Sequence, residues 1–223
     1  MSVRTRWRLS GVAGIAFVAL SLFASGLNEL PPAYDQDGAA LVAWLAQNGR
    51  SFRFWHFVAG LAFLLFYFPF FAGLCERLRE AEGAPALWSR VAWAGAIISP
   101  AAGTISGAFI VGLALLGGRA SPEVAIFGAA AQHYALAVSG AYGGVVMLGA
   151  AVVILRTGIF WRWLGWAAAA IGVAAIAGTA AIVEADPSGP FASISGFAWL
   201  AYFLWMGAVS VAMIRTREAP AVP

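Results

Sequence analysis

The chain has 223 residues, of which 62% are hydrophobic and 10% are charged, and its mean hydropathy is +0.84. An ordinary soluble domain is about 45–50% apolar, so this composition indicates a membrane protein with no length left for a separate soluble domain. The net charge of +3 comes from thirteen basic residues, all of them arginine, against ten acids. We assign these arginines to membrane flanks, and we do not expect the protein to bind nucleic acid.

Apolar runs predict an all-α integral membrane protein, a bundle of six transmembrane helices in one transmembrane domain over residues 1–223. A span needs about 20 apolar residues. The first run follows three arginines, and Ala24-Ser25-Gly26 resembles a signal-peptide cleavage site, but the run favours an uncleaved first span. The spans are expected at about residues 9–28, 52–75, 91–116, 122–155, 162–184 and 191–214.

The first outer connection is the longest hydrophilic segment of the chain. Pro31-Pro32 stops the preceding helix, and Asp35 or Asp37 can cap a new one. Its apolar stripe includes Leu41 and Leu45 and ends at Asn48-Gly49. This pattern predicts a short amphipathic helix over about 37–48, lying on the membrane or over the mouth of the bundle.

The later spans carry their own signals. The second is rich in aromatic residues, and Pro69 is expected to kink it, because proline removes a helix hydrogen bond and crowds the preceding turn. Ser121-Pro122-Glu123 predicts the start of the fourth span, since a capping serine precedes a proline and an acid. Cys75 has no cysteine partner and is expected to be a small buried hydrophobe.

Small residues recur every fourth position in the third span, and similar ladders follow in the fourth. Four small side chains in one row form a groove that another backbone can approach closely. We therefore expect the third and fourth spans to pack groove to groove as the glycine-lined core of the bundle. The helix-packing residues predicted in this way are Gly95, Ser99, Gly103, Gly107, Ser139, Gly140, Gly143 and Gly144.

The arginines also predict the orientation. With six alternating spans, ten arginines fall on one face, and only Arg50, Arg53 and Arg119 fall on the other. Short loops rich in arginine stay in the cytoplasm. Both termini are thus expected in the cytoplasm of a bacterium, and the protein in its inner membrane.

Counting from these arginines places four polar residues at one depth. Glu29 lies 21 residues beyond Arg8, His56 lies 21 before Arg77, His133 lies 23 before Arg156, and Glu184 lies 22 beyond Arg162. At about 1.5 Å per residue, all four come near the outer boundary of a ~30 Å core.

One interpretation is that these residues share a depth only because the membrane–water interface tolerates polar side chains, so that they form no site. The other is a shallow outward-facing site, with Gln132 beside His133, that binds a cation, a proton or a polar headgroup.

No catalytic or metal-binding motif accompanies these residues. We expect no cofactor and a non-enzymatic role, in which the protein binds a lipophilic or headgroup ligand from the bilayer, or packs against a membrane partner or a second copy of itself. The alternative is a redox protein in which His56 and His133 ligate a b-type haem, or a small-solute or ion transport protein that uses them in a site at the outer membrane boundary. A metal site that includes a carboxylate ligand is a further alternative. The two classes separate on whether the imidazoles approach each other.

Three segments resemble the bacterial DUF4386-type membrane proteins. They are DQDGAALVAWLAQNGR in the outer connection, CERLRE after the second span, and LRTGIFWRWLGWAAAAIGVAAIAG around the fifth. In that family a Gly-Phe-Pro-Arg-Trp-Leu-Gly turn commonly precedes the fifth span. Here the run from Phe160 to Gly165 is similar, with Trp161 where proline is usual. The resemblance implies a multi-span membrane protein of unassigned function and supplies no catalytic residues.

Overall fold

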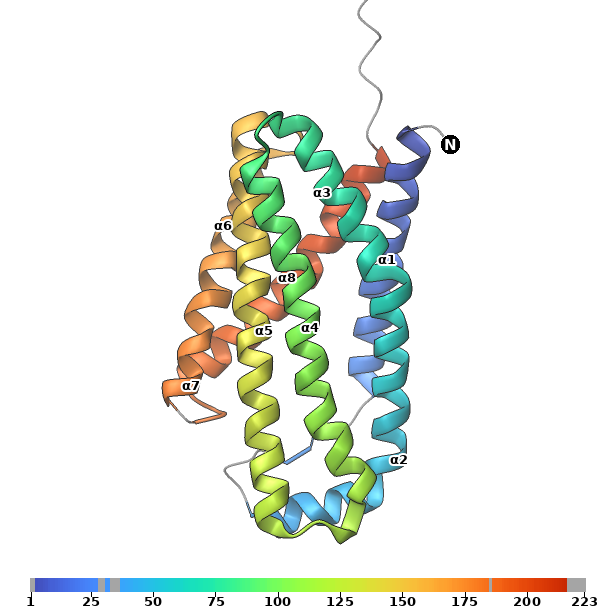
Figure 1. Cartoon of the computed structure of the whole chain (residues 1–223), viewed down its shortest axis with the longest axis vertical. Coiled ribbons are helices and arrows are strands. Elements are labelled where there is room, and N and C mark those ends of the chain that lie inside the picture. Colours follow the sequence, from blue (N-terminus) through green and yellow to red (C-terminus); the bar gives the residue numbers. More distant parts are fainter. Residues whose placement is uncertain (1–2, 28–30, 33–36, 185, 216–223) are drawn as a thin grey trace, which may run out of the picture.

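The computed structural model describes residues 3–27, 31–32, 37–184 and 186–215, and all regular structure in them is helical (Figure 1). Within these ranges, six helical stretches are long and apolar enough to cross a membrane, as the sequence predicts. The elements are α1 (Val3–Leu27), α2 (Gly38–Ala62), the π-turn η1 (Phe63–Tyr67), α3 (Phe68–Glu82), α4 (Leu87–Leu116), η2 (Gly117–Arg119), α5 (Pro122–Thr157), α6 (Arg162–Ala177), η3 (Gly178–Ala180), α7 (Ala181–Glu184) and α8 (Pro190–Arg215).

The predicted helix over 37–48 is not a separate element. Asp37 caps it as expected, with Oδ1 accepting a hydrogen bond of 2.9 Å from the Ala39 amide, but α2 continues through Asn48-Gly49 into the second span. The first part of α2 lies across one end of the bundle before the helix turns along it (Figure 1). Gly49 does not end this helix. A Cβ there would lie 3.1 Å from the carbonyl oxygen of Ala114, so glycine allows α2 to cross close to the end of α4.

The distortion expected at Pro69 lies in the turns before it. Pro69 has no amide hydrogen, and its ring crowds the carbonyl four residues earlier. The helix widens over η1, where the Phe68 amide donates to the carbonyl of Phe63. As a result both Phe63 and Tyr67 pack against Phe17 of α1, with ring centroids 4.8 and 5.3 Å away.

The helices alternate between two ends of the bundle (Figure 1). The start of α1, the end of α8 and the α3–α4 and α5–α6 connections lie at the same end, whereas η2 lies at the other. Arg77, Arg90 and Arg156 therefore belong to the first end, and Arg53 and Arg119 to the second. The separation of the arginines that sequence alone predicts is present in the fold.

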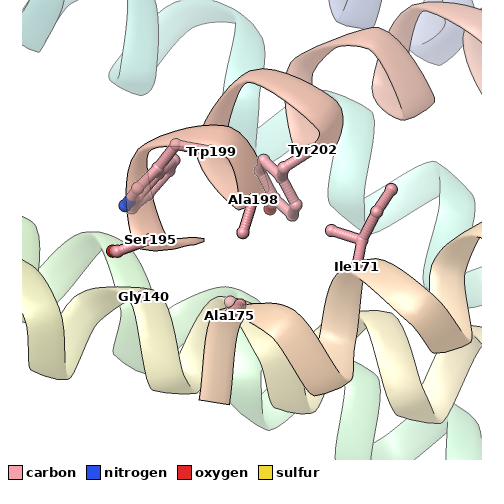
Figure 2. Close-up of a pocket in the computed structure, with 8 residues that line it drawn as sticks. Gly140, Ile171, Ala175, Ser195, Ala198, Trp199 and Tyr202 are labelled. Carbon is pink, nitrogen blue, oxygen red and sulfur yellow. The ribbon is translucent and has the colours of Figure 1, made fainter. Parts of the chain in front are cut away.

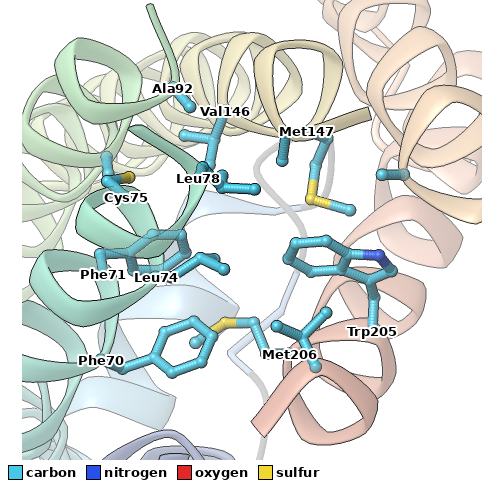
Figure 3. Packing of buried hydrophobic residues seen from close by; sticks show 14 of the residues in the cluster. Phe70, Phe71, Leu74, Cys75, Leu78, Ala92, Val146, Met147, Trp205 and Met206 are labelled. Atoms are coloured by element: carbon cyan, nitrogen blue, oxygen red, sulfur yellow. The ribbon is translucent and has the colours of Figure 1, made fainter. Parts of the chain in front are cut away.

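Two hydrophobic clusters hold the bundle together. The main core joins α3, α5 and α8, where Phe70, Phe71 and Leu74 face Met147 and Met206 (Figure 3). Cys75 is buried in it, as predicted. A second core joins the first part of α2 to the ends of α4 and α5 near η2, through Leu41, Leu45, Phe52, Ile110, Leu113, Ala114, Ala125 and Ala129.

The contact between α4 and α5 is the most extensive of any helix pair. At its centre Ser99 and Ser139 bond reciprocally: Ser99 Oγ donates to the Ser139 carbonyl at 2.9 Å, and Ser139 Oγ donates to the Ser99 carbonyl at 2.7 Å. A Cβ on Gly95 would lie 2.9 Å from the Tyr142 carbonyl oxygen. Each hydroxyl thus satisfies a backbone group across the interface, where the small side chains allow close approach.

The remaining predicted packing residues divide among different neighbours. Gly103 and Gly143 lie beside the serine pair. Gly144 faces the Gly172 carbonyl of α6, and Gly140 faces Trp199 of α8. Gly107 has open space where a Cβ would be, so the ladder of the third span does not face α5 over its whole length.

Candidate functional site

Of the described residues of the predicted layer, His56 alone lines either of two pockets, one at His56 and one between α5, α6 and α8. Glu29 lies outside the described residues. Glu184 accepts a hydrogen bond of 3.1 Å from the Phe191 amide in the first turn of α8. A carboxylate at a helix N-terminus stabilises the free amides and the helix dipole there, so Glu184 has a structural role.

Gln132 and His133 lie on α5, whereas His56 lies on α2. The Gln132 carbonyl oxygen accepts a hydrogen bond of 2.9 Å from Ser106 Oγ of α4. His133 is partly buried on the same turn. Neither residue lines the pocket that contains His56.

His56 lines a pocket of about 220 Å³ between α1, α2, η1 and α8, which we call the His56 pocket. The lining residues on α2 and η1 are spaced three or four positions from Ala59, so their side chains share one face of the continuous helix. Opposite them are residues of α1 and α8 that are distant in sequence. The lining residues are Ser21, Ala24, Trp55, His56, Ala59, Phe63 and Phe203.

The imidazole of His56 is fixed by its own helix. Nδ1 lies 3.0 Å from the carbonyl oxygen of Phe52, one turn earlier, and because a carbonyl only accepts, Nδ1 carries the hydrogen. The ring also packs on the Phe52 ring, with centroids 4.2 Å apart. Nε2 is therefore the acceptor nitrogen, and it has no hydrogen-bond partner among the described residues.

The pocket lies between the two hydrophobic cores. Phe52, which holds His56, belongs to the second core and contacts Trp44 of the crossing part of α2, with ring centroids 5.4 Å apart. Phe63 and Phe203, at the other side of the pocket, pack against the main core. The walls are thus anchored in two separately packed regions.

A second, smaller crevice lies between α5, α6 and α8. Figure 2 shows Trp199 and Ser195 of α8 beside Gly140 of α5. Nε1 of Trp199 is buried there, with no hydrogen-bond partner among the described residues. The crevice has room of about 10 Å³, enough for one water molecule and too little for a ligand.

The donor set of the His56 pocket does not fit the haem or metal alternatives. Axial ligation of a b-type haem by two histidines needs a second imidazole, and no α5 residue lines the pocket. In the part of the chain that the structure describes, no three histidine, cysteine or acidic side chains gather as metal ligands would. The described lining offers one imidazole acceptor, the Ser21 hydroxyl, the Trp55 indole N–H and apolar walls.

Sequence reasoning found His56 and missed the rest of the pocket. Ser21, Trp55 and Phe203 carry no motif, and only the fold brings the three helices together. In comparisons with known proteins, no family model, no curated protein and no solved structure matches the chain. The likeness to the DUF4386-type proteins thus stays a prediction.

Proposed function

We propose that this is a bacterial inner-membrane protein, with both termini in the cytoplasm, that binds a lipophilic molecule in the His56 pocket and does not act as an enzyme. The orientation rests on the arginines, since the end of the bundle that holds most of them is the one expected to stay in the cytoplasm. In this orientation the first part of α2 crosses the outer end of the bundle.

The observation that carries the proposal is an open pocket with mainly apolar walls and one polar side chain, His56, that is fixed by a hydrogen bond. Most ligand pockets are lined by apolar and aromatic side chains, with a few polar groups that set orientation. The His56 pocket follows this pattern, with Phe63 and Phe203 as walls and His56 as the fixed group. The adjoining η1 adds support, because π-turns inside α-helices are frequent at functional sites.

A photoreactive lipid tests the proposal. The protein is reconstituted in nanodiscs and irradiated with a diazirine-bearing hexadecanol, and the labelled residues are mapped by mass spectrometry. We expect saturable labelling of the segments that contain Ser21, Trp55 to Phe63 and Phe203. Excess unlabelled hexadecanol should remove it.

Two matched variants separate the pocket from the lipid-facing surface. Ala59→Trp places an indole in the pocket and should abolish the saturable labelling. Leu64→Trp adds the same group on the adjoining turn, where Leu64 is 63% exposed, and should leave the labelling unchanged. Labelling that never saturates, or that survives in Ala59→Trp, would show that the lipid only coats the bundle.

A further inference from the structure

We infer that the ligand of the His56 pocket is a neutral lipid with a hydroxyl group, and that this hydroxyl donates its hydrogen bond to Nε2 of His56. The inference rests on the proposed function and adds the chemical class of the ligand. It follows from the tautomer of His56, the other polar groups of the pocket and the charges of its walls.

The tautomer decides which kind of group His56 can recognise. Nδ1 uses its hydrogen on the Phe52 carbonyl, so neutral His56 presents only the lone pair of Nε2. That nitrogen is not fully buried, and its residue lines the pocket. A ligand must bring a donor to meet it. Ketones, ethers and esters only accept, so they leave Nε2 unpaired in an apolar pocket, at a cost in affinity.

A hydroxyl group, which both donates and accepts hydrogen bonds, fits the polar groups of the pocket better than a group that only donates. Ser21 and Trp55 also line the pocket, and each carries a hydrogen that it can donate. A hydroxyl can donate to His56 and accept from one of these two residues at once. A methyl ether of the same chain can make only the second bond.

The walls select against charge. None of the described residues that line the pocket is an arginine or an acid. A charged headgroup would leave water without a counter-charge, which is costly in an apolar environment. The alanine and phenylalanine side chains of Ala59, Phe63 and Phe203 instead suit an aliphatic or isoprenoid chain.

Competition between two chain-matched lipids tests the inference. Hexadecanol and hexadecyl methyl ether are each titrated against the diazirine probe in the nanodisc assay. On the wild-type protein, hexadecanol should displace the probe at a concentration approximately tenfold lower than hexadecyl methyl ether does. This is the ratio that one hydrogen bond of about 1.4 kcal/mol provides. In His56→Phe, which keeps an aromatic ring against Phe52, the ratio should fall below about twofold. The Ser21→Ala variant keeps His56 and should still bind hexadecanol more tightly than hexadecyl methyl ether.

The outcomes distinguish this inference from the proposed function. Equal displacement of wild type by the two lipids would overturn the hydroxyl assignment and leave a lipid-binding pocket. A preference that survives in His56→Phe would overturn the role of Nε2. Absence of saturable labelling by the probe would overturn the proposed function itself. The wild-type ratio needs no variant, so a His56→Phe protein that does not fold still leaves the assignment decided by that ratio.

Discussion

At the scale of single residues, the reciprocal bonds of Ser99 and Ser139 tie α4 to α5. Their hydroxyl oxygens also lie 3.4 Å apart, so the two bonds share one small polar site. We predict that Ser99→Ala and Ser139→Ala each lower the free energy of unfolding by about 1 kcal/mol. Each substitution removes one donor and leaves the carbonyl that the other hydroxyl binds. The hydroxyls are in contact, so the loss in the double variant should differ from the sum by at least about 0.5 kcal/mol.

Detergent-induced unfolding, followed by circular dichroism, measures these changes. Thr104→Ala is the matched control, since Thr104 donates to the Pro100 carbonyl of its own helix at 2.8 Å and joins no other helix. It should have little effect. Strictly additive losses would mean that the two serines act independently.

At the scale of elements, the glycines of α4 show which face of a helix is in contact. A Cβ at Gly95 would meet the Tyr142 carbonyl oxygen at 2.9 Å and the Val146 amide nitrogen at 3.0 Å, and backbone cannot move aside cheaply. We predict that Gly95→Ala destabilises the protein by about 1–3 kcal/mol. Gly107→Ala is the same change on the same helix with nothing within 4 Å, and it should be neutral or stabilising by up to about 1 kcal/mol.

The same unfolding measurement compares the two variants. Equal destabilisation by both would show that the predicted ladder packs along its whole length, against the observed geometry. Equal stabilisation by both would show that α4 and α5 do not approach closely at Gly95.

The contrast between these glycines shows what spacing can and cannot predict. A repeat of four places Gly95, Ser99, Gly103 and Gly107 on one row of a helix, and this follows from helix geometry alone. Which neighbour covers each position depends on tilt and rotation, which packing sets. For the same reason the sequence did not identify Gly14 of α1, where a Cβ would collide with the Ser210 hydroxyl of α8.

The crossing part of α2 is a second case. The cap at Asp37 and the stripe of Leu41 and Leu45 predicted a helix, and a helix begins there. Asn48-Gly49 was wrongly interpreted as its end, because glycine weakens a helix when no contact needs it. Here the contact with the Ala114 carbonyl needs it. Local propensity could not reveal a reason that lies 65 residues further along the chain.

At the scale of the whole molecule, counting residues along a span predicts depth and carries no information on lateral position. Counting residues from flanking arginines placed His56 and His133 at similar heights, and a helix rises by a constant amount per residue. The count carries no information on which side of the bundle each lies. Ser21 and Phe203 complete the pocket of His56, and His133 lies on another helix. The fold class was therefore predictable, and the composition of the site was not.

The orientation of the whole bundle makes the last prediction. Two exposed residues can report it. Glu80 lies near the arginine-rich end of the bundle, and Ser188 lies in the α7–α8 connection at the other end, so we replace each with cysteine. Each is made in a Cys75→Ala background. In intact bacterial cells, a membrane-impermeant maleimide should label Ser188→Cys and should label Glu80→Cys only after lysis, because arginine-rich segments stay in the cytoplasm.

If Glu80→Cys is labelled in intact cells and Ser188→Cys is protected, the protein has the opposite orientation in the membrane. The crossing part of α2 would then lie on the cytoplasmic side, and a lipid would reach His56 from the inner leaflet. Since the pocket is nearer to the end of the bundle that α2 crosses, this one measurement also decides which leaflet supplies the ligand.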